Sequence, residues 1–287
     1  MTIVQVNGVK LHVQELAPGG PLRSQPPQTA VLIHGMAGDD MASWYFTLAQ
    51  PLADAGMRVL LYDLRGHGRS ERPAQGYRLA DFVADLAALL AAREITGKVC
   101  LFGNSFGGTV AFGFAARFPD RVRAIVAVES APPIPVWFAR IGQRLDRVTA
   151  SMAAASPARG GGASRAQAEA AAGTGARSDD PDERLIRRAR RTRELLADTM
   201  IARELPASAL PDPERIAAVA CPVLCLYGGD SALRDLAAET ARLLPQAHLA
   251  VLPGQRHSLL IDRPDLVRGH VLPWLAELGI AGSSQTP

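Results

Sequence analysis

In Val99-Cys-Leu-Phe-Gly103-Asn104-Ser105-Phe106-Gly107-Gly108, a short apolar run ends abruptly in Gly-x-Ser-x-Gly. A helix-forming stretch from Thr109 to Phe118 follows at once. This pattern predicts a nucleophile elbow, a strained turn between a strand and a helix that carries the serine. A side chain at either flanking glycine would collide with the neighbouring strand or helix. We therefore expect Ser105 at a helix N-terminus, where backbone N–H groups and the helix dipole favour an oxyanion.

A second apolar run lies upstream and reads Thr29-Ala-Val-Leu-Ile33-His34-Gly35-Met36. It predicts another buried strand, which ends in His-Gly. Acyl-transfer chemistry at an elbow needs two backbone N–H groups, and the second comes from the loop after such a strand. We therefore assign the oxyanion hole to the backbone N–H groups of Met36 and Phe106, and place Gly35 beside the substrate.

Two further strands, predicted over Cys221–Tyr227 and His248–Leu252, are each followed by a polar residue of catalytic type. Asp230 comes after Gly228-Gly229, and His257 comes after Pro253-Gly254. Ser105, Asp230 and His257 then stand in the chain order Ser, Asp, His, each just past the end of a strand. Glu129, which ends the predicted strand Val122–Val128, is the alternative to Asp230 as the acid.

With these motifs the chain resembles the α/β-hydrolase-fold enzymes. The resemblance covers roughly residues 1–132 and 212–281. It implies a mainly parallel eight-stranded sheet flanked by helices, with a helical cap inserted. It also implies a cofactor-independent hydrolase in which His257 takes the proton of Ser105 and Asp230 orients the imidazole. Aspartate nucleophiles, as in the epoxide hydrolases and haloalkane dehalogenases of this fold, are excluded by Ser105.

Composition narrows the class of protein further. With 287 residues and 48% hydrophobic residues the chain is long enough for one α/β domain with an insertion. A net charge of +3 does not argue for a nucleic-acid partner. No apolar run is long enough for a membrane span, and no secretory signal is evident, so we expect a cytoplasmic protein. Cys100, Cys221 and Cys225 lack the spacing of a metal site.

The alternation of strand and helix patterns stops at Ser130-Ala-Pro-Pro and resumes at Cys221. Helices are expected over Ser43–Ala55, Leu79–Arg93 and Phe106–Phe118, and Asn7-Gly8 predicts a hairpin. We predict a hydrolase core over residues 1–132 and 212–287, and a helical cap over residues 133–211, inserted after the sixth strand.

Within the predicted cap, apolar residues recur at helical spacing from Pro135 to Met152. Trp137 and Phe138 are candidates for substrate contact, and packing of the cap against the core is the alternative. A glycine-rich stretch from Ser156 to Ser178 is expected to be mobile. A second helix should begin after Asp180 and run to about Glu204. That helix carries an arginine cluster, which suggests an acyl carrier protein as partner or else a solvated face: Arg184, Arg187, Arg188, Arg190, Arg191 and Arg193.

The motifs leave the substrate open. An ester or thioester of a small to medium organic acid is the preferred reading. The elbow Gly-Asn-Ser-Phe-Gly-Gly is also similar to that of the meta-cleavage-product hydrolases, which cleave carbon–carbon bonds of dienone acids. Ser258 stands after His257, where those enzymes carry an aromatic residue. Acyl transfer to an acceptor other than water, and a binding protein without catalysis, are the remaining alternatives.

Overall fold

A computed structural model describes residues 2–19, 26–155 and 181–281. Its centre is one eight-stranded sheet, as the resemblance implies, and the strands stand in the order β1-β2-β4-β3-β5-β6-β7-β8. The strands are listed here in chain order: β1 (Thr2–Val6), β2 (Val9–Leu16), β3 (Thr29–Ile33), β4 (Arg58–Tyr62), β5 (Val99–Asn104), β6 (Val122–Val128), β7 (Val223–Gly228) and β8 (His248–Leu252).

The sheet combines an antiparallel hairpin with a parallel body. Strands β1 and β2 pair antiparallel around Asn7 and Gly8, both of which have positive φ, as expected for an Asn-Gly hairpin. Strand β2 also pairs antiparallel with β4. Every pair from β4 through β3, β5, β6 and β7 to β8 is parallel. The carboxyl ends of these six strands therefore share one edge of the sheet, where open α/β folds bind their ligands.

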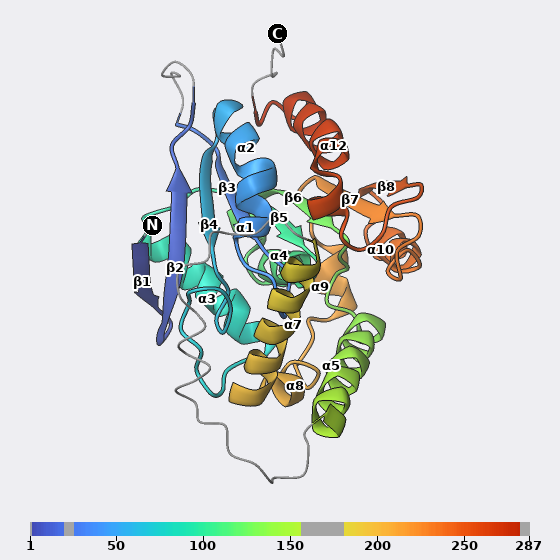
Figure 1. Ribbon diagram of the computed structural model, residues 1–287. Helices are drawn as coiled ribbons and strands as arrows, with labels where there is room; N and C mark the ends of the chain where they lie inside the picture. Colours follow the sequence, from blue (N-terminus) through green and yellow to red (C-terminus); the bar gives the residue numbers. More distant parts are fainter. Residues whose placement is uncertain (1, 20–25, 156–180, 282–287) are drawn as a thin grey trace.

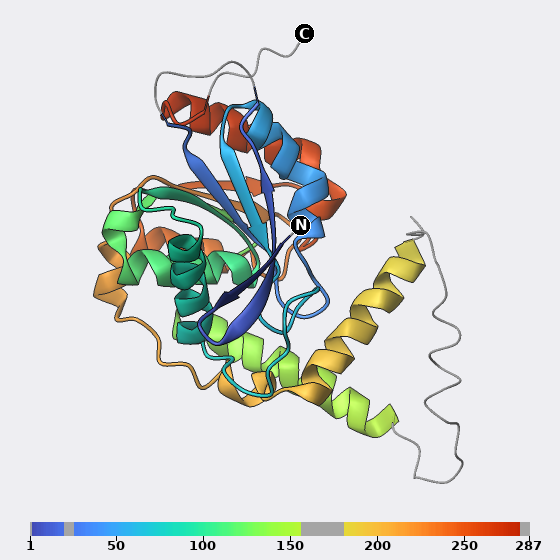
Figure 2. The same cartoon turned by 90° about the vertical axis from the view of Figure 1, so that its left-hand side faces the viewer.

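Helices cover both faces of the sheet, so that two apolar clusters lie between the layers (Figure 2). On one face pack α3 (Leu79–Ala92), α4 (Phe106–Arg117), α9 (Pro213–Ala217) and α10 (Leu236–Leu243). On the other lie α1 (Ala42–Trp44), η1 (Tyr45–Ala49), α2 (Gln50–Asp54), α11 (Leu259–Asp262) and α12 (Pro264–Glu277). A short 3-10 turn, η2 (Pro119–Arg121), joins α4 to β6. The expected helix over Ser43–Ala55 is thus three short pieces, the middle one a π-helix.

The insertion between β6 and β7 is helical. It contains α5 (Pro135–Ala155), α7 (Pro181–Asp198) and α8 (Ile201–Glu204). These three helices gather at one end of the molecule, away from α2 and α12 (Figure 1). The second helix predicted for this region therefore breaks after Asp198. The stretch Ser156–Ser178 and the expected cap residue Asp180 lie outside the described residues. The cap boundaries at residues 133 and 211 stay a prediction.

Candidate active site

Ser105 lies on the turn between β5 and α4, with φ 50° and ψ −121°. This region of backbone space is rarely occupied by a residue other than glycine, and such strain is concentrated at functional sites. A Cβ on Gly103 would overlap the backbone of Gly108, and one on Gly107 would overlap the carbonyl oxygen of Ile33. The two glycines are therefore required by close packing, and the geometry of the elbow is the one that the motif predicts.

His257 follows β8, and its side chain is partly exposed. Its Nδ1 atom lies 3.0 Å from Oε2 of Glu129, whose side chain is completely buried. Glu129 directly follows β6 and has a positive φ of 51°. With Nδ1 facing the carboxylate, Nε2 is the imidazole nitrogen left for a reaction partner.

Asp230 does not make the contact that the sequence analysis expects of it. Its side chain is exposed and forms no hydrogen bond or ion pair within the described residues. Its backbone N–H donates to the carbonyl oxygen of Gln255 at 2.9 Å, which ties the turn after β7 to the turn after β8. That arrangement leaves the Asp230 carboxylate in solvent, whereas the Glu129 side chain is buried directly after the end of β6. In the structure, the hydrogen-bond partner of His257 is thus Glu129, the alternative that the sequence analysis names, and not the expected Asp230. Which of the two carboxylates acts as the catalytic acid stays a prediction.

The proposed nucleophile and base are not hydrogen-bonded to each other. No bond joins Ser105 Oγ to His257 in the part of the chain that the structure covers, and the Ser105 backbone N–H donates to the carbonyl oxygen of Val128 at 2.9 Å. Both residues follow carboxyl ends of parallel strands, at the same edge of the sheet.

The loop after β3 leaves one backbone N–H available at the expected place. Gly35 N–H donates to Asp39 Oδ2 at 2.7 Å, and Ala37 N–H donates to His67 Nε2 at 3.0 Å. Met36 N–H, between them, has no acceptor among the described residues, and neither has Phe106 N–H at the start of α4. These are the two donors that the sequence analysis assigns to an oxyanion hole.

His67 holds this loop as a neutral imidazole. It is buried, its Nδ1 lies 2.8 Å from the carbonyl oxygen of Arg65, and its Nε2 accepts from Ala37. Because a carbonyl oxygen only accepts, the proton is on Nδ1. Burial, together with the neighbouring His34, lowers the pKa of His67 to about 3.

Helix α7 packs directly onto the same loop. A Cβ on Gly38 would lie 2.6 Å from the Arg188 Cα atom, and Arg191 forms an ion pair with Asp40 at 2.5 Å. Two other arginines of the predicted cluster pair along the helix, Arg187 with Glu183 and Arg190 with Glu194. The side chain of Arg184 lies outside the described part. Several of the arginines thus have carboxylate partners within this chain.

Trp137 and Phe138 are both buried at the start of α5. The indole Nε1–H of Trp137 donates to Thr109 Oγ1 on α4 at 2.8 Å. In turn, the Thr109 hydroxyl donates to the carbonyl oxygen of Ala131 at 3.0 Å. These bonds attach the inserted helix to the helix of the elbow. A substrate-binding role for Trp137, Phe138 and Gly35 stays a prediction.

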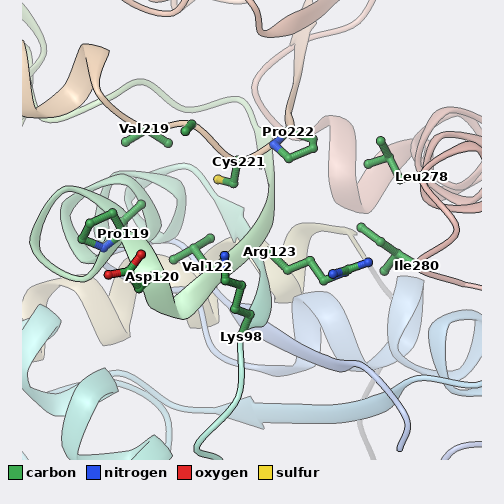
Figure 3. Close-up of a pocket in the computed structure, with 12 residues that line it drawn as sticks. Lys98, Pro119, Asp120, Val122, Arg123, Val219, Cys221, Pro222, Leu278 and Ile280 are labelled. Atoms are coloured by element: carbon green, nitrogen blue, oxygen red, sulfur yellow. The ribbon is translucent and has the colours of Figure 1, made fainter. Parts of the chain in front are cut away.

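A hollow of about 400 Å³ lies at the opposite edge of the sheet (Figure 3). Its walls include Lys98, Val122 and Pro222, which stand at or just before the starts of β5, β6 and β7. Ser105 and Glu129 follow the other ends of β5 and β6. At about 3.3 Å per residue, the length of a strand separates the hollow from these residues. The hollow is therefore not part of the candidate active site.

Within residues 2–19, 26–155 and 181–281, no group of three or more His, Cys, Asp or Glu side chains is placed to hold a metal ion. In the same ranges, no helix is both long enough and apolar enough to cross a membrane.

Residues 30–264 match the family model described as the alpha/beta hydrolase fold. The match spans most of the chain and includes Met36, Ser105, Glu129 and His257. The chain belongs to the α/β-hydrolase fold family. The eight-stranded sheet and the helices on both of its faces agree with that membership.

Curated relatives match parts of this chain. It is 34% identical over 126 residues to the 2-hydroxy-6-oxo-2,4-heptadienoate hydrolase of Pseudomonas putida. The aligned stretch covers 43% of this chain and 42% of the relative. It is also 34% identical over 184 residues to lipase LipV of Mycobacterium tuberculosis, 62% of this chain and 63% of the lipase. The chain thus aligns with less than two thirds of the length of either relative.

Solved structures resemble this chain over nearly its full length. A carboxylesterase of the thaumarchaeon Nitrososphaera gargenis has a TM-score of 0.69 at 24% identity, with 97% of this chain and 99% of that chain covered. An enol-lactonase from Burkholderia xenovorans LB400 has a TM-score of 0.69 at 22% identity, covering 96% and 100%. At these identities the likeness concerns the fold.

The sequence analysis assigned no role to two residues that bind Glu129. Ser231 donates its hydroxyl hydrogen to Glu129 Oε2, and the Gly228 backbone N–H donates to Glu129 Oε1. Both stand in the turn where Asp230 was expected to act. The only signal in the sequence for this arrangement was the serine directly after Asp230.

Proposed function

We propose that this protein is a cofactor-independent serine hydrolase whose catalytic residues are Ser105, His257 and Glu129. The observation that carries the proposal is the pairing of His257 with a buried carboxylate at the edge of the sheet where the elbow presents Ser105. A serine hydroxyl is a weak nucleophile until an adjacent base activates it. A base oriented by a third group is the arrangement that such activation needs.

In the proposed reaction, His257 Nε2 accepts the proton of Ser105 as Oγ attacks the carbonyl carbon of the substrate. The N–H groups of Met36 and Phe106 stabilise the resulting oxyanion, each worth about 2.7–4 kcal/mol. His257 then protonates the leaving group, and an acyl-enzyme remains on Ser105. Water attacks this acyl-enzyme in the same way and releases the acid. Throughout, Glu129 holds the imidazole and compensates the charge of the imidazolium.

The substrate that we propose is a carboxylic ester or thioester of a small to medium organic acid. The intact nucleophile, base and acid support hydrolysis over a purely binding role. The similarity in sequence to a lipase, over 62% of this chain, is in keeping with an ester.

A second candidate is carbon–carbon bond hydrolysis of the meta-cleavage-product type. Two relatives favour it: the heptadienoate hydrolase named above, and a 2-hydroxymuconate semialdehyde hydrolase from Pseudomonas sp. that is 36% identical over 126 residues. The elbow Gly-Asn-Ser-Phe-Gly-Gly adds to this similarity. Ser258, where those enzymes carry an aromatic residue, speaks against it.

Covalent labelling tests the proposed nucleophile without knowledge of the substrate. A fluorophosphonate probe should label the wild type at Ser105 and leave Ser105→Ala unlabelled, with equal circular dichroism spectra for the two proteins. The control variant Ser130→Ala, which alters a buried serine outside the elbow, should still be labelled at Ser105. Labelling of Ser105→Ala at another serine would overturn the assignment.

A substrate panel then separates the two candidate reactions. We expect turnover of p-nitrophenyl esters or acyl thioesters, and little turnover of dienone acids. Faster cleavage of dienone acids than of every ester and thioester would assign the carbon–carbon reaction instead.

A further inference from the structure

We infer that Ser231 is a positioning residue that acts through Glu129. This inference rests on the proposed function, because it concerns the acid of the proposed catalytic set. The turn after β7 contains Asp230, the acid that the sequence motif predicts. In this inference the turn serves catalysis through the hydroxyl of Ser231, the residue after Asp230.

The hydrogen bonds around Ser231 have a fixed direction. Ser231 Oγ lies within hydrogen-bonding distance of Glu129 Oε2 and accepts the backbone N–H of Leu233 at 3.1 Å. A serine hydroxyl has one hydrogen, and a carboxylate only accepts. The hydrogen therefore points to Glu129, and the bond from Leu233 keeps the hydroxyl oxygen in place.

Oε2 of Glu129 is shared between the two residues. It accepts the Ser231 hydroxyl and also lies 3.0 Å from Nδ1 of His257. The other oxygen, Oε1, accepts the Gly228 backbone N–H. Both carboxylate oxygens are thus held by the end of β7 and the turn that follows it. This segment therefore sets the direction in which the Glu129 carboxylate faces the imidazole.

Ser231 also supplies a hydrogen bond to the buried carboxylate of Glu129. A buried carboxylate needs hydrogen bonds to replace those of water. In the described part of the chain, His257 is the only side chain able to carry a positive charge that pairs with Glu129. Tyr227 is a further titratable group near Glu129. Burial, with a contribution from Glu129, raises the Tyr227 pKa well above its usual value, so this phenol stays neutral. Among the described residues, the exposed side chain of Asp230 forms no hydrogen bond or ion pair with Glu129.

Loss of the hydroxyl should change the pH dependence of Ser105 reactivity. Without it, His257 is the only described residue that still donates to Oε2, and the negative charge of the carboxylate is less well compensated. The Glu129–His257 pair should then take up a proton at a higher pH, and a protonated pair does not activate Ser105. A residue that only packs the turn would change stability and leave this profile in place.

The test is the rate of fluorophosphonate labelling of Ser105 from pH 5 to pH 9. In Ser231→Ala the acidic limb of the profile should move up by about one pH unit, and the plateau rate should fall by about 10-fold, as for a lost hydrogen bond to a charged group. Ser231→Thr, which keeps a hydroxyl, should bring both the acidic limb and the plateau rate most of the way back to the wild-type values. The matched control Asp230→Ala, one residue away, should behave as the wild type.

If Ser231→Ala does not fold, Ser231→Cys provides the same comparison with a group of similar shape and a weaker donor, and should give a smaller shift in the same direction. A wild-type profile in a folded Ser231→Ala or Ser231→Cys variant would overturn the inference, as would an equal shift in Asp230→Ala. The variant Ser105→Ala distinguishes a failure of the proposed function from a failure of this inference. If the proposed function is wrong, the probe should still label Ser105→Ala.

Discussion

Glu129 Oε2 lies 3.0 Å from His257 Nδ1, although 128 residues of sequence separate them. The contact joins the ends of β6 and of the turn after β8, across the intervening strand β7. Because β7 lies between, its turn is in a position to bind the carboxylate from the other side, through Gly228 and Ser231. The acid of the proposed catalytic set is therefore supported by the strand whose own acid, Asp230, faces solvent.

The buried His67 should make the protein sensitive to mild acid. Its pKa of about 3 in the folded state is below the ordinary value of about 6.5, so below pH 6.5 the unfolded chain binds a proton that the folded chain excludes. Stability from this group is thus complete above pH 6.5 and falls by about 1.4 kcal/mol per pH unit between pH 6.5 and 3.

Urea unfolding of the wild type and His67→Gln at pH 7.5 and pH 5 measures this effect. The variant should be less stable at pH 7.5, and the loss on going to pH 5 should be smaller than in the wild type by about 2 kcal/mol. His270, at the surface on α12, offers a control: His270→Gln should lose as much as the wild type. Equal losses for His67→Gln and the wild type would show that His67 is not held neutral.

Trp137 should contribute to stability by joining α5 to α4. Trp137→Ala removes a buried indole and its bond to Thr109, and should lower the free energy of unfolding by about 3–5 kcal/mol. Trp137→Phe, which keeps most of the ring and loses the donor, should cost about 1 kcal/mol. Thermal melts measure both. If Trp137 also lines the pocket, ratios of kcat/KM between large and small acyl groups should change by about 10-fold in Trp137→Ala. A melting temperature equal to that of the wild type would exclude the packing role.

Activity should not depend on a metal ion. The proposed reaction uses only Ser105, His257, Glu129 and two backbone N–H groups, so ester hydrolysis should survive EDTA and dialysis unchanged. A loss of turnover on chelation that a divalent ion restores would place the chemistry outside the proposed class.

Local patterns predicted much of this fold. The elbow, the Asn7-Gly8 hairpin and the parallel strands each have short-range signals, and these coincide with the observed elements. The partner of His257 has no such signal, because Glu129 and Asp230 both follow parallel strands and both carry a carboxylate. What separates them is burial and the direction of the side chain at the strand end. These depend on how three neighbouring turns pack, which one sequence does not reveal.

The break of the first helix into α1, η1 and α2 also escaped the sequence analysis. Apolar residues from Ser43 to Ala55 fit a regular helix well enough to predict one. The π-helical turn at Tyr45–Ala49 inserts an extra residue into the hydrogen-bond pattern, and periodicity over so short a stretch does not detect it.

The most direct test of the account compares Glu129→Gln with Asp230→Asn in one assay of ester hydrolysis or of Ser105 labelling. Both changes remove a charge and keep the shape of the side chain. Glu129→Gln should lower kcat by about 10⁴-fold, because the imidazole loses the group that holds its tautomer. Asp230→Asn should stay within a few-fold of the wild type. The reverse result, with Asp230→Asn inactive and Glu129→Gln active, would contradict the assignment of Glu129 as the acid.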